Sequence, residues 1–424
     1  MNENLFIVDA LVYDPLIKEK KKKNILINNG IIKDITTKAT IPQGYLKIDC
    51  SDMIVTTGFV DIRAHFNDPG NSYEETLYSG SAAAVAGGYT KVCIMPDTNP
   101  IIDNGEIVDY INSISEMIPI DIFTIGAATS QLEGRELSEI GLMKKSGIVA
   151  ISDYEKPIQN GQLLRMIIEY AKKFDIPVIN HPEDLFLANS GVMHEGNIST
   201  INGVAGTPDI SESTMLFRDI SIASYVKGRI HVPHVSSRRS VELIRDAKNK
   251  GIQVTAEVTP HHLYFNHEKF SDFNSKWKVC PPVRTESDRN SLIEALIEGS
   301  IDCIATDHSP HRIENKENDL YNASYGTIGL ESAFGAVNKV MSDYKIDTFK
   351  VIDWLTVNPA SIMKIDLNEI IPKNKANLTI IDPKKEWIFN SNSVKSNSKN
   401  SIFDNQKLYG KIIHTVVGSK IFSN

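Results

Sequence analysis

The chain has 424 residues, which exceeds the usual size of a single domain and predicts one large domain with a smaller one. Its composition, 41% hydrophobic and 23% charged, is typical of a globular protein, and its net charge of −8 argues against non-specific binding to nucleic acid. No apolar run reaches the roughly 18 residues of a membrane-spanning helix, and the polar start lacks a signal-peptide core, so we expect a cytoplasmic protein without membrane attachment.

Cysteines and local charge give two further expectations. Cys50, Cys93, Cys280 and Cys303 are scattered and form no C-x-x-C pair, which predicts free thiols, mostly buried. The one strong basic cluster, residues 18–23, is interpreted as a solvated loop between two short strands rather than a nucleic-acid patch.

Both ends of the chain consist of short apolar segments typical of β-strands. Near the start, Asn29-Gly30 separates two apolar runs, which is a strong signal for a β-hairpin. Neither end has enough strands to fold alone. We therefore predict one small composite β-sandwich domain, built from residues 1–53 and 366–424.

Between the ends, residues 54–365 alternate strand and helix patterns. Helical periodicity is clear in residues 161–174, whose apolar side chains share one face. Eight alternations predict an α/β fold of the (β/α)8 barrel type rather than an open sheet. The expected strands are residues 54–62, 90–95, 120–126, 148–152, 177–181, 229–236, 253–258 and 301–306.

Side chains able to bind a metal follow five of these strands, at the end of the barrel where such enzymes hold their active sites. They are His65, Asp153, His181, His234 and Asp307. The middle three come from consecutive strands and can converge on one ion, for which nitrogen and oxygen donors favour zinc. His65 and Asp307 come from strands that meet where the barrel closes, and either hold a second ion or flank the first.

This pattern predicts hydrolytic chemistry. A single strand-end histidine is more often structural, but five ligand-type residues at matching positions favour a metal site. Three protein ligands with an open position for water form the catalytic arrangement. The metal lowers the pKa of the bound water, and Asp307 takes the water proton and passes it to a leaving nitrogen.

These motifs resemble those of the amidohydrolase superfamily and, within it, the bacterial dihydroorotase family. The resemblance implies a distorted barrel of the metal-dependent hydrolase type with a composite β domain, a zinc cofactor, and interconversion of dihydroorotate and N-carbamoyl-aspartate in pyrimidine biosynthesis. It runs over almost the whole chain and includes Met95-Pro-Asp-Thr-Asn-Pro100, His181-Pro-Glu-Asp-Leu185, Glu257-Val-Thr-Pro-His-His-Leu263, Pro281-Pro-Val-Arg284 and Ile301–His311.

The first departure from the family pattern follows the first barrel strand. The family motif Asp-x-His-x-His-x-Arg reads Asp61-Ile-Arg63-Ala-His65-Phe-Asn67 here. Arg63 therefore stands in place of a metal-binding histidine, and Asn67 in place of an arginine that grips the substrate carboxylate. Since a guanidinium keeps its charge, a second ion beside Arg63 is disfavoured, and we expect one zinc. Arg63 is then expected to pair with an aspartate, Asp307 or Asp97, or to meet a substrate carboxylate.

Other departures lie at substrate-binding positions. Two asparagines of the family align with Asp97 and Cys280, whereas His311, a further substrate contact, matches. Loss of the family's arginine at Asn67 forfeits a contact worth roughly 1.5–3 kcal/mol, and Asp97 repels a carboxylate.

Three functions therefore remain open: a dihydroorotase with a rearranged single-metal site, a zinc hydrolase of another cyclic amide such as a hydantoin or dihydropyrimidine, and a non-catalytic homologue that supports a carbamoyltransferase. A homodimer is also compatible with the sequence. Catalysis is favoured, because among the family's metal-binding positions only that of Arg63 departs.

Overall fold

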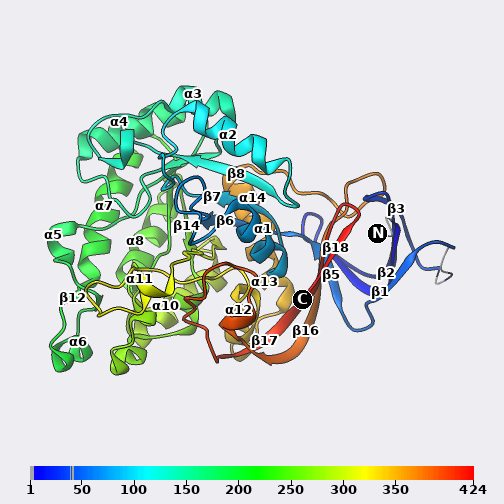
Figure 1. Ribbon diagram of the computed structural model, residues 1–424. Coiled ribbons are helices and arrows are strands. Elements are labelled where there is room, and N and C mark those ends of the chain that lie inside the picture. Colours follow the sequence, from blue (N-terminus) through cyan, green and yellow to red (C-terminus); the bar gives the residue numbers. More distant parts are fainter. Residues whose placement is uncertain (1–3, 39, 41–42) are drawn as a thin grey trace.

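The computed structural model describes residues 4–38, 40 and 43–424, and places a parallel barrel beside a sheet made from both ends of the chain (Figure 1). The barrel strands lie side by side in sequence order. The barrel closes where Ala64 pairs with His308 and the His65 N–H donates to the His308 carbonyl at 2.8 Å. The predicted (β/α)8 barrel is confirmed. Its strands are β6 (Phe59–Ala64), β7 (Tyr89–Ile94), β8 (Asp121–Gly126), β9 (Ala150–Ser152), β10 (Val178–Ile179), β13 (Ile230–Val232), β14 (Val254–Val258) and β15 (Cys303–Ile304).

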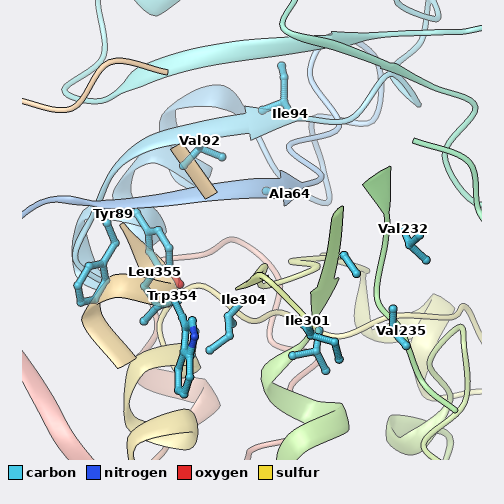
Figure 2. Close-up of a cluster of buried hydrophobic side chains, with 14 of the residues drawn as sticks. Ala64, Tyr89, Val92, Ile94, Val232, Val235, Ile301, Ile304, Trp354 and Leu355 are labelled. Carbon is cyan, nitrogen blue, oxygen red and sulfur yellow. The ribbon is translucent and has the colours of Figure 1, made fainter. Parts of the chain in front are cut away.

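Helices pack around the outside of these strands. Figure 2 shows part of the apolar core between them, where Tyr89, Ile304 and Trp354 belong to β7, β15 and α13. Helix α4 buries Leu163 and Ile167 on one face, as its periodicity predicts. The covering helices are α1 (Leu77–Ala86), α2 (Gly105–Ser115), α3 (Ile140–Ser146), α4 (Gly161–Lys172), α7 (Asp209–Val226), α8 (Arg238–Asn249), α10 (Glu286–Glu298), α12 (Ala333–Asp343), α13 (Thr348–Leu355) and α14 (Val357–Met363).

Short elements fill the loops that follow three barrel strands. The loop after β10 is the longest and carries a parallel pair of two-residue strands. These loops line the mouth of the barrel. Their elements are α5 (Leu185–Ala188), β11 (Met193–His194), α6 (Asn197–Asn202), β12 (Gly206–Thr207), α9 (Pro260–Tyr264) and α11 (Ile313–Lys316).

The two ends of the chain join in one mixed sheet with the strand order β18-β17-β16-β5-β1-β2-β3, in which β4 also pairs with β1. The predicted hairpin is confirmed: Asn28 pairs with Ile31, and Asn29 and Gly30 have φ of 48° and 78°, as a two-residue type I′ turn requires. The strands are β1 (Asn4–Asp14), β2 (Glu19–Asn28), β3 (Ile31–Thr36), β4 (Leu46–Asp49), β5 (Ile54–Thr57), β16 (Asn377–Ile388), β17 (Lys407–Val417) and β18 (Lys420–Ser423).

Two sequence interpretations of this region are wrong. The strand predicted over 54–62 is divided at Gly58 into β5, which pairs with β1 and β16, and barrel strand β6. A Cβ at Gly58 would lie 2.2 Å from the Thr90 side chain, so only glycine fits at the crossing. Residues 19–23 of the basic run form the mostly exposed first half of β2 rather than a loop, and only Lys18 lies in the turn before it. The division of the chain into residues 1–53 with 366–424 and 54–365 stays a prediction.

Between β16 and β17 the chain leaves the terminal sheet and runs to the mouth of the barrel. We call residues 389–406 the crossing segment. The Asn400 side chain donates to the Ser309 carbonyl at 2.9 Å and accepts the His311 N–H at 3.0 Å. The loop after β15 is therefore held partly by residues from the terminal sheet.

In the described part of the chain no helix is long and apolar enough to cross a membrane. All four cysteines are free. Three are buried, and Cys280 is partly exposed.

Candidate active site

A buried ion pair joins the first and last strands of the barrel. Nε of Arg63, on β6, lies 2.8 Å from Oδ1 of Asp307, which follows β15. Burial by itself would raise the pKa of Asp307, but the charge of Arg63 and the contact with His65 hold that pKa well below its usual range. Of the partners considered for Arg63, the structure selects Asp307. Nη2 of Arg63 has no hydrogen-bond partner among the described residues.

A second pair, His65 with Asp97, lies beside the first. Nδ1 of His65 is 3.0 Å from both carboxylate oxygens of Asp97, whereas its Nε2 is 3.8 Å from Asp307, too far for a hydrogen bond. Burial lowers the pKa of His65, but the carboxylates of Asp97 and Asp307 together outweigh burial and raise that pKa to about 9. Asp97 is thus committed to His65.

The two remaining predicted substrate contacts on this side, Asn67 and His311, both face Glu74. Nδ2 of Asn67 donates to Glu74 at 3.2 Å, and Nδ1 of His311 lies 3.4 Å from the other carboxylate oxygen. Burial raises the pKa of Glu74, but the interaction with His311 lowers it overall. Glu74 was not predicted from the sequence, because nothing in its spacing marks it as a partner of Asn67.

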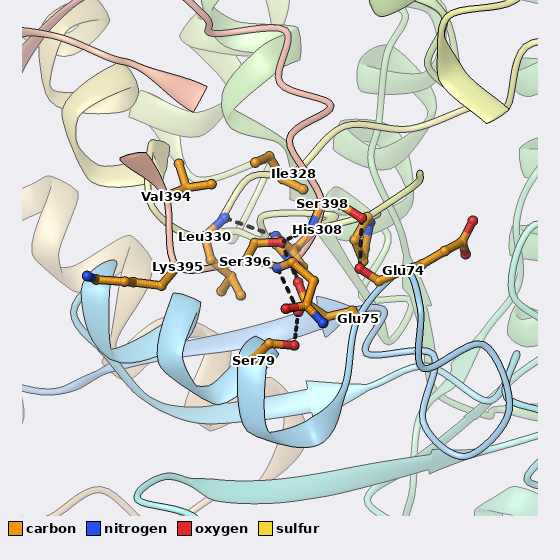
Figure 3. A network of polar contacts seen from close by, with 12 residues as sticks. Glu74, Glu75, Ser79, His308, Ile328, Leu330, Val394, Lys395, Ser396 and Ser398 are labelled. Carbon is orange, nitrogen blue, oxygen red and sulfur yellow. Dashed lines mark hydrogen bonds and ion pairs between the residues drawn. The ribbon is translucent and has the colours of Figure 1, made fainter. Parts of the chain in front are cut away.

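A polar network anchors the loop that carries Asp307 (Figure 3). Nδ1 of His308 accepts the Gly329 N–H at 3.2 Å, so Nε2 carries the proton and faces Glu75 at 3.4 Å. Glu75 also accepts the Ser396 hydroxyl and the Asn397 N–H from the crossing segment. The position of Asp307 therefore depends on contacts that reach the far end of the chain.

The opposite side of the site contains two buried histidines in contact. Nδ1 of His181, after β10, lies 3.1 Å from Nε2 of His234, after β13. Burial holds the pKa of His234 well below its usual value, so this imidazole is neutral, and its Nδ1 has no hydrogen-bond partner among the described residues. These two predicted ligands are brought together.

Asp153, the third predicted ligand, is held by the loop after β8. One carboxylate oxygen accepts the N–H groups of Ala128 and Thr129 at 2.9 and 2.8 Å, and the other accepts the Thr129 hydroxyl. Burial raises the pKa of Asp153 to about 6. One lone pair of this carboxylate remains free, since each oxygen can accept two hydrogen bonds.

The donor atoms fit one divalent ion better than two. The 3.1 Å between the facing nitrogens of His181 and His234 is close to the roughly 3.3 Å between two nitrogen ligands of a tetrahedral zinc. Beside His65 the charged guanidinium of Arg63 occupies the partner position of Asp307, so these residues do not fit a second ion.

A cavity of about 300 Å³ is lined by two residues that contact His181, namely Cys280 and Glu183. Cys280, predicted to contact substrate, lines it together with Glu155, Glu183 and Tyr325. His261, after β14, is buried with both ring nitrogens unpartnered among the described residues. Cys280 thus contacts His181, whereas Asn67 contacts Glu74 and Asp97 contacts His65.

Comparisons with known proteins agree with this architecture. Residues 54–422 match the amidohydrolase family. A dihydroorotase from Geobacter metallireducens is 37% identical over 99% of both chains, and one from Caldicellulosiruptor saccharolyticus is 39% identical over 99% of this chain and 97% of its own. The solved L-hydantoinase (dihydropyrimidinase) from Arthrobacter aurescens has a TM-score of 0.85 at 21% identity, covering 99% of this chain and 96% of that one, which shows a shared fold.

Proposed function

Since the chain belongs to the amidohydrolase family, we propose that it is a dihydroorotase-like hydrolase of cyclic amides, which interconverts dihydroorotate and N-carbamoyl-aspartate in pyrimidine biosynthesis in the cytoplasm. The observation that carries this proposal is the 37–39% identity to dihydroorotases over nearly the whole chain, together with Asp307 at the closing strand of the barrel.

The residues support a division of roles. Zinc, when bound, would polarise the ring carbonyl and supply an activated water, and His181 and His234 would hold it, with Asp153 as the predicted third ligand. Asp307 accepts a proton from the attacking water and delivers it to the departing ring nitrogen. Arg63 positions Asp307 but also lowers its pKa and so weakens it as a base. Slow turnover is therefore expected.

A carboxylated substrate has two groups available to it, Nη2 of Arg63, which has no hydrogen-bond partner among the described residues, and the imidazole of His311. One observation favours a second candidate, a neutral ring such as a hydantoin. Asn67 carries no positive charge that could bind a substrate carboxylate, and Asp97 in this site is an acceptor paired with His65 rather than a donor. The amide side chain of Asn67 is moreover bonded to Glu74 rather than free.

Zinc analysis combined with assays in both directions tests these candidates. We expect turnover of dihydroorotate and N-carbamoyl-aspartate by zinc-loaded protein, with hydantoin and dihydrouracil as comparison substrates. The double variant Asn67→Arg/Asp97→Asn should raise kcat/KM for dihydroorotate by roughly 10- to 100-fold. Turnover confined to the neutral rings would select the second candidate. Metal-free protein without turnover would select a structural role, as a homodimer or beside a carbamoyltransferase.

A further inference from the structure

Helix α7 presents an uncharged stripe to solvent. Its charged side chains, such as Glu212 and Arg218, are buried or half-buried in contacts within the chain. The exposed residues between Asp209 and Lys227, all of which the structure describes, are Ile210, Thr214, Phe217, Ser221, Ser224 and Tyr225. The first five are spaced alternately four and three residues apart, which places them along one side of the helix and is the spacing of a helix–helix seam. The neighbouring helix α8 instead exposes arginine and acidic side chains.

Neighbouring segments widen this stripe. Helix α5 lies beside the start of α7 and exposes Phe186, and the Arg165 guanidinium of α4 lies 5.3 Å from the centre of the Tyr225 ring. In Figure 1, α4, α5 and α7 lie at the edge of the barrel away from the terminal sheet. Phe186, Tyr225 and Phe217 are 89%, 75% and 62% exposed. These three side chains present roughly 450 Å² to solvent, and apolar patches of that size usually mark interaction sites. We call the stripe together with Phe186 the α7 face.

We propose that the α7 face binds a second copy of this chain, with the two α7 helices antiparallel about a two-fold axis at Phe217. In that arrangement each residue faces the one at an equal distance on the other side of the axis. The large Ile210 side chain then meets the small Ser224, and Thr214 meets Ser221. The two Phe217 rings meet at the axis. Large side chains therefore face small ones away from the axis, as close packing between helices requires.

The charges at the two ends of α7 complement each other in the same arrangement. Asp209 begins the helix and Lys227 follows its end, so antiparallel pairing brings Asp209 of one copy opposite Lys227 of the other. Lys227 is exposed and makes no ion pair in the described part of the chain, whereas Asp209 also contacts Arg239 at 2.7 Å. A parallel pairing would instead bring like charges together. Charge thus selects the antiparallel arrangement that the side-chain sizes favour.

The α7 face is large enough for a stable dimer. A standard interface buries about 800 Å² on each partner, and the three exposed aromatic side chains alone supply more than half of that area. The second copy would also cover α5, whose Leu185 and Ala188 line the cavity beside Cys280. The pairing requires neither metal nor turnover, so it stands or falls independently of the proposed function.

The oligomeric state of the full-length protein, measured by analytical ultracentrifugation, tests the α7 face. Wild-type protein should be a dimer at micromolar concentrations. Phe217→Asp should weaken the dimer on the order of 100-fold, because two like charges would then meet at the axis. Tyr110→Asp, at an exposed aromatic residue of α2, is the matched control and should leave the dimer unchanged. A dimer that survives Phe217→Asp would overturn the proposal, and so would a monomeric wild type, including one that binds only an added carbamoyltransferase.

Cysteine cross-linking tests the antiparallel register. Under mild oxidation, Phe217→Cys should give a disulfide-linked dimer, since this position meets its own copy at the axis. The double variant Ile210→Cys/Ser224→Cys keeps the Phe217 ring and should also cross-link. Ser224→Cys alone should not, because antiparallel pairing separates its two copies by roughly 21 Å along the helices. Wild-type protein with its four free cysteines gives the background. Cross-linking by Ser224→Cys alone, or none in the double variant, would refute the arrangement.

Discussion

The two sides of the barrel mouth treat their polar groups differently. On the β6 and β15 side the charged groups are paired inside the protein, Arg63 with Asp307 and His65 with Asp97. On the β10 and β13 side, His181 and His234 contact each other, and Nδ1 of His234 has no hydrogen-bond partner among the described residues. Arg63, His65, Asp307, His181 and His234 are all buried, and only Asp97 is partly exposed, so exposure to solvent does not explain the difference.

The contrast separates groups that hold the fold from groups available to a ligand. A buried charge without a partner is costly, and the first side meets that requirement within the chain. Burying a neutral imidazole without a hydrogen-bond partner costs less free energy than burying an unpaired charge. The nitrogens on the second side can therefore stay available to a metal or a substrate. The ion pair with Arg63 stabilises the charged form of Asp307, so it opposes the protonation of Asp307 that catalysis requires.

The largest expected effect comes from Asp307→Asn, which removes the acid–base group. Turnover of cyclic amides should fall by roughly 10²- to 10⁴-fold, while metal stays bound to the histidines. Steady-state kinetics and metal analysis measure the two quantities. Asp302→Asn, at the opposite end of β15, is the control and should keep its activity. An Asp307→Asn protein with undiminished turnover would show that another group moves the proton.

Breaking the ion pair from the other side should mainly affect stability. Arg63→Met leaves Asp307 as a buried charge without its guanidinium partner, and the free energy of unfolding should fall by about 3–5 kcal/mol. The double variant Arg63→Met/Asp307→Leu removes both charges and should recover most of that loss. Urea denaturation of the wild type, the single variants Arg63→Met and Asp307→Leu, and the double variant gives the coupling free energy. If the loss of unfolding free energy in the double variant equals the sum of the losses in the two single variants, the two side chains do not form a pair of this strength.

The pair of His65 and Asp97 should make stability depend on pH. The pKa of His65 is about 9 in the folded chain, against roughly 6.5 when unfolded. The stability that the charged His65 gains from Asp97 is therefore fully present below about pH 6.5 and is lost as the pH rises through 9. Unfolding of wild-type protein at pH 6 and pH 9.5 should show this loss, and His65→Gln should show less of it. An equal loss of unfolding free energy between pH 6 and pH 9.5 in both proteins would mean that Asp97 does not keep His65 protonated.

The smallest effect on stability is expected at His261, the buried histidine after β14. Neither ring nitrogen of His261 has a hydrogen-bond partner in the part of the chain that the structure describes, so His261→Phe should change the free energy of unfolding by less than about 1 kcal/mol. His231 is the matched control, since its nitrogens lie 2.9 Å from Thr255 and 3.1 Å from Glu257. Its replacement by Phe should cost about 2–3 kcal/mol. Similar losses of unfolding free energy in both variants would mean that the hydrogen bonds of His231 do not make it more important for stability than His261.

The sequence predicts the barrel because strands and helices alternate with clear periodicity, and it predicts which residues follow each strand. It does not predict the break at Gly58, since the apolar run continues across it. It also leaves open where a carboxylate points: Asp153 follows its strand as expected, but backbone N–H groups of another loop hold it. The approach of Cys280 to His181 joins loops about a hundred residues apart, which no local spacing reveals.

The crossing segment makes the terminal sheet part of the active-site architecture. Ser396 and Asn397 contact Glu75, and Asn400 holds the backbone beside His311, so these contacts break if β16 and β17 separate. Local opening of that sheet and loss of order around Asp307 should then be one cooperative event. Cleavage of the chain, or insertion of a tag, within residues 389–406 should abolish turnover while leaving most barrel amides protected from hydrogen exchange.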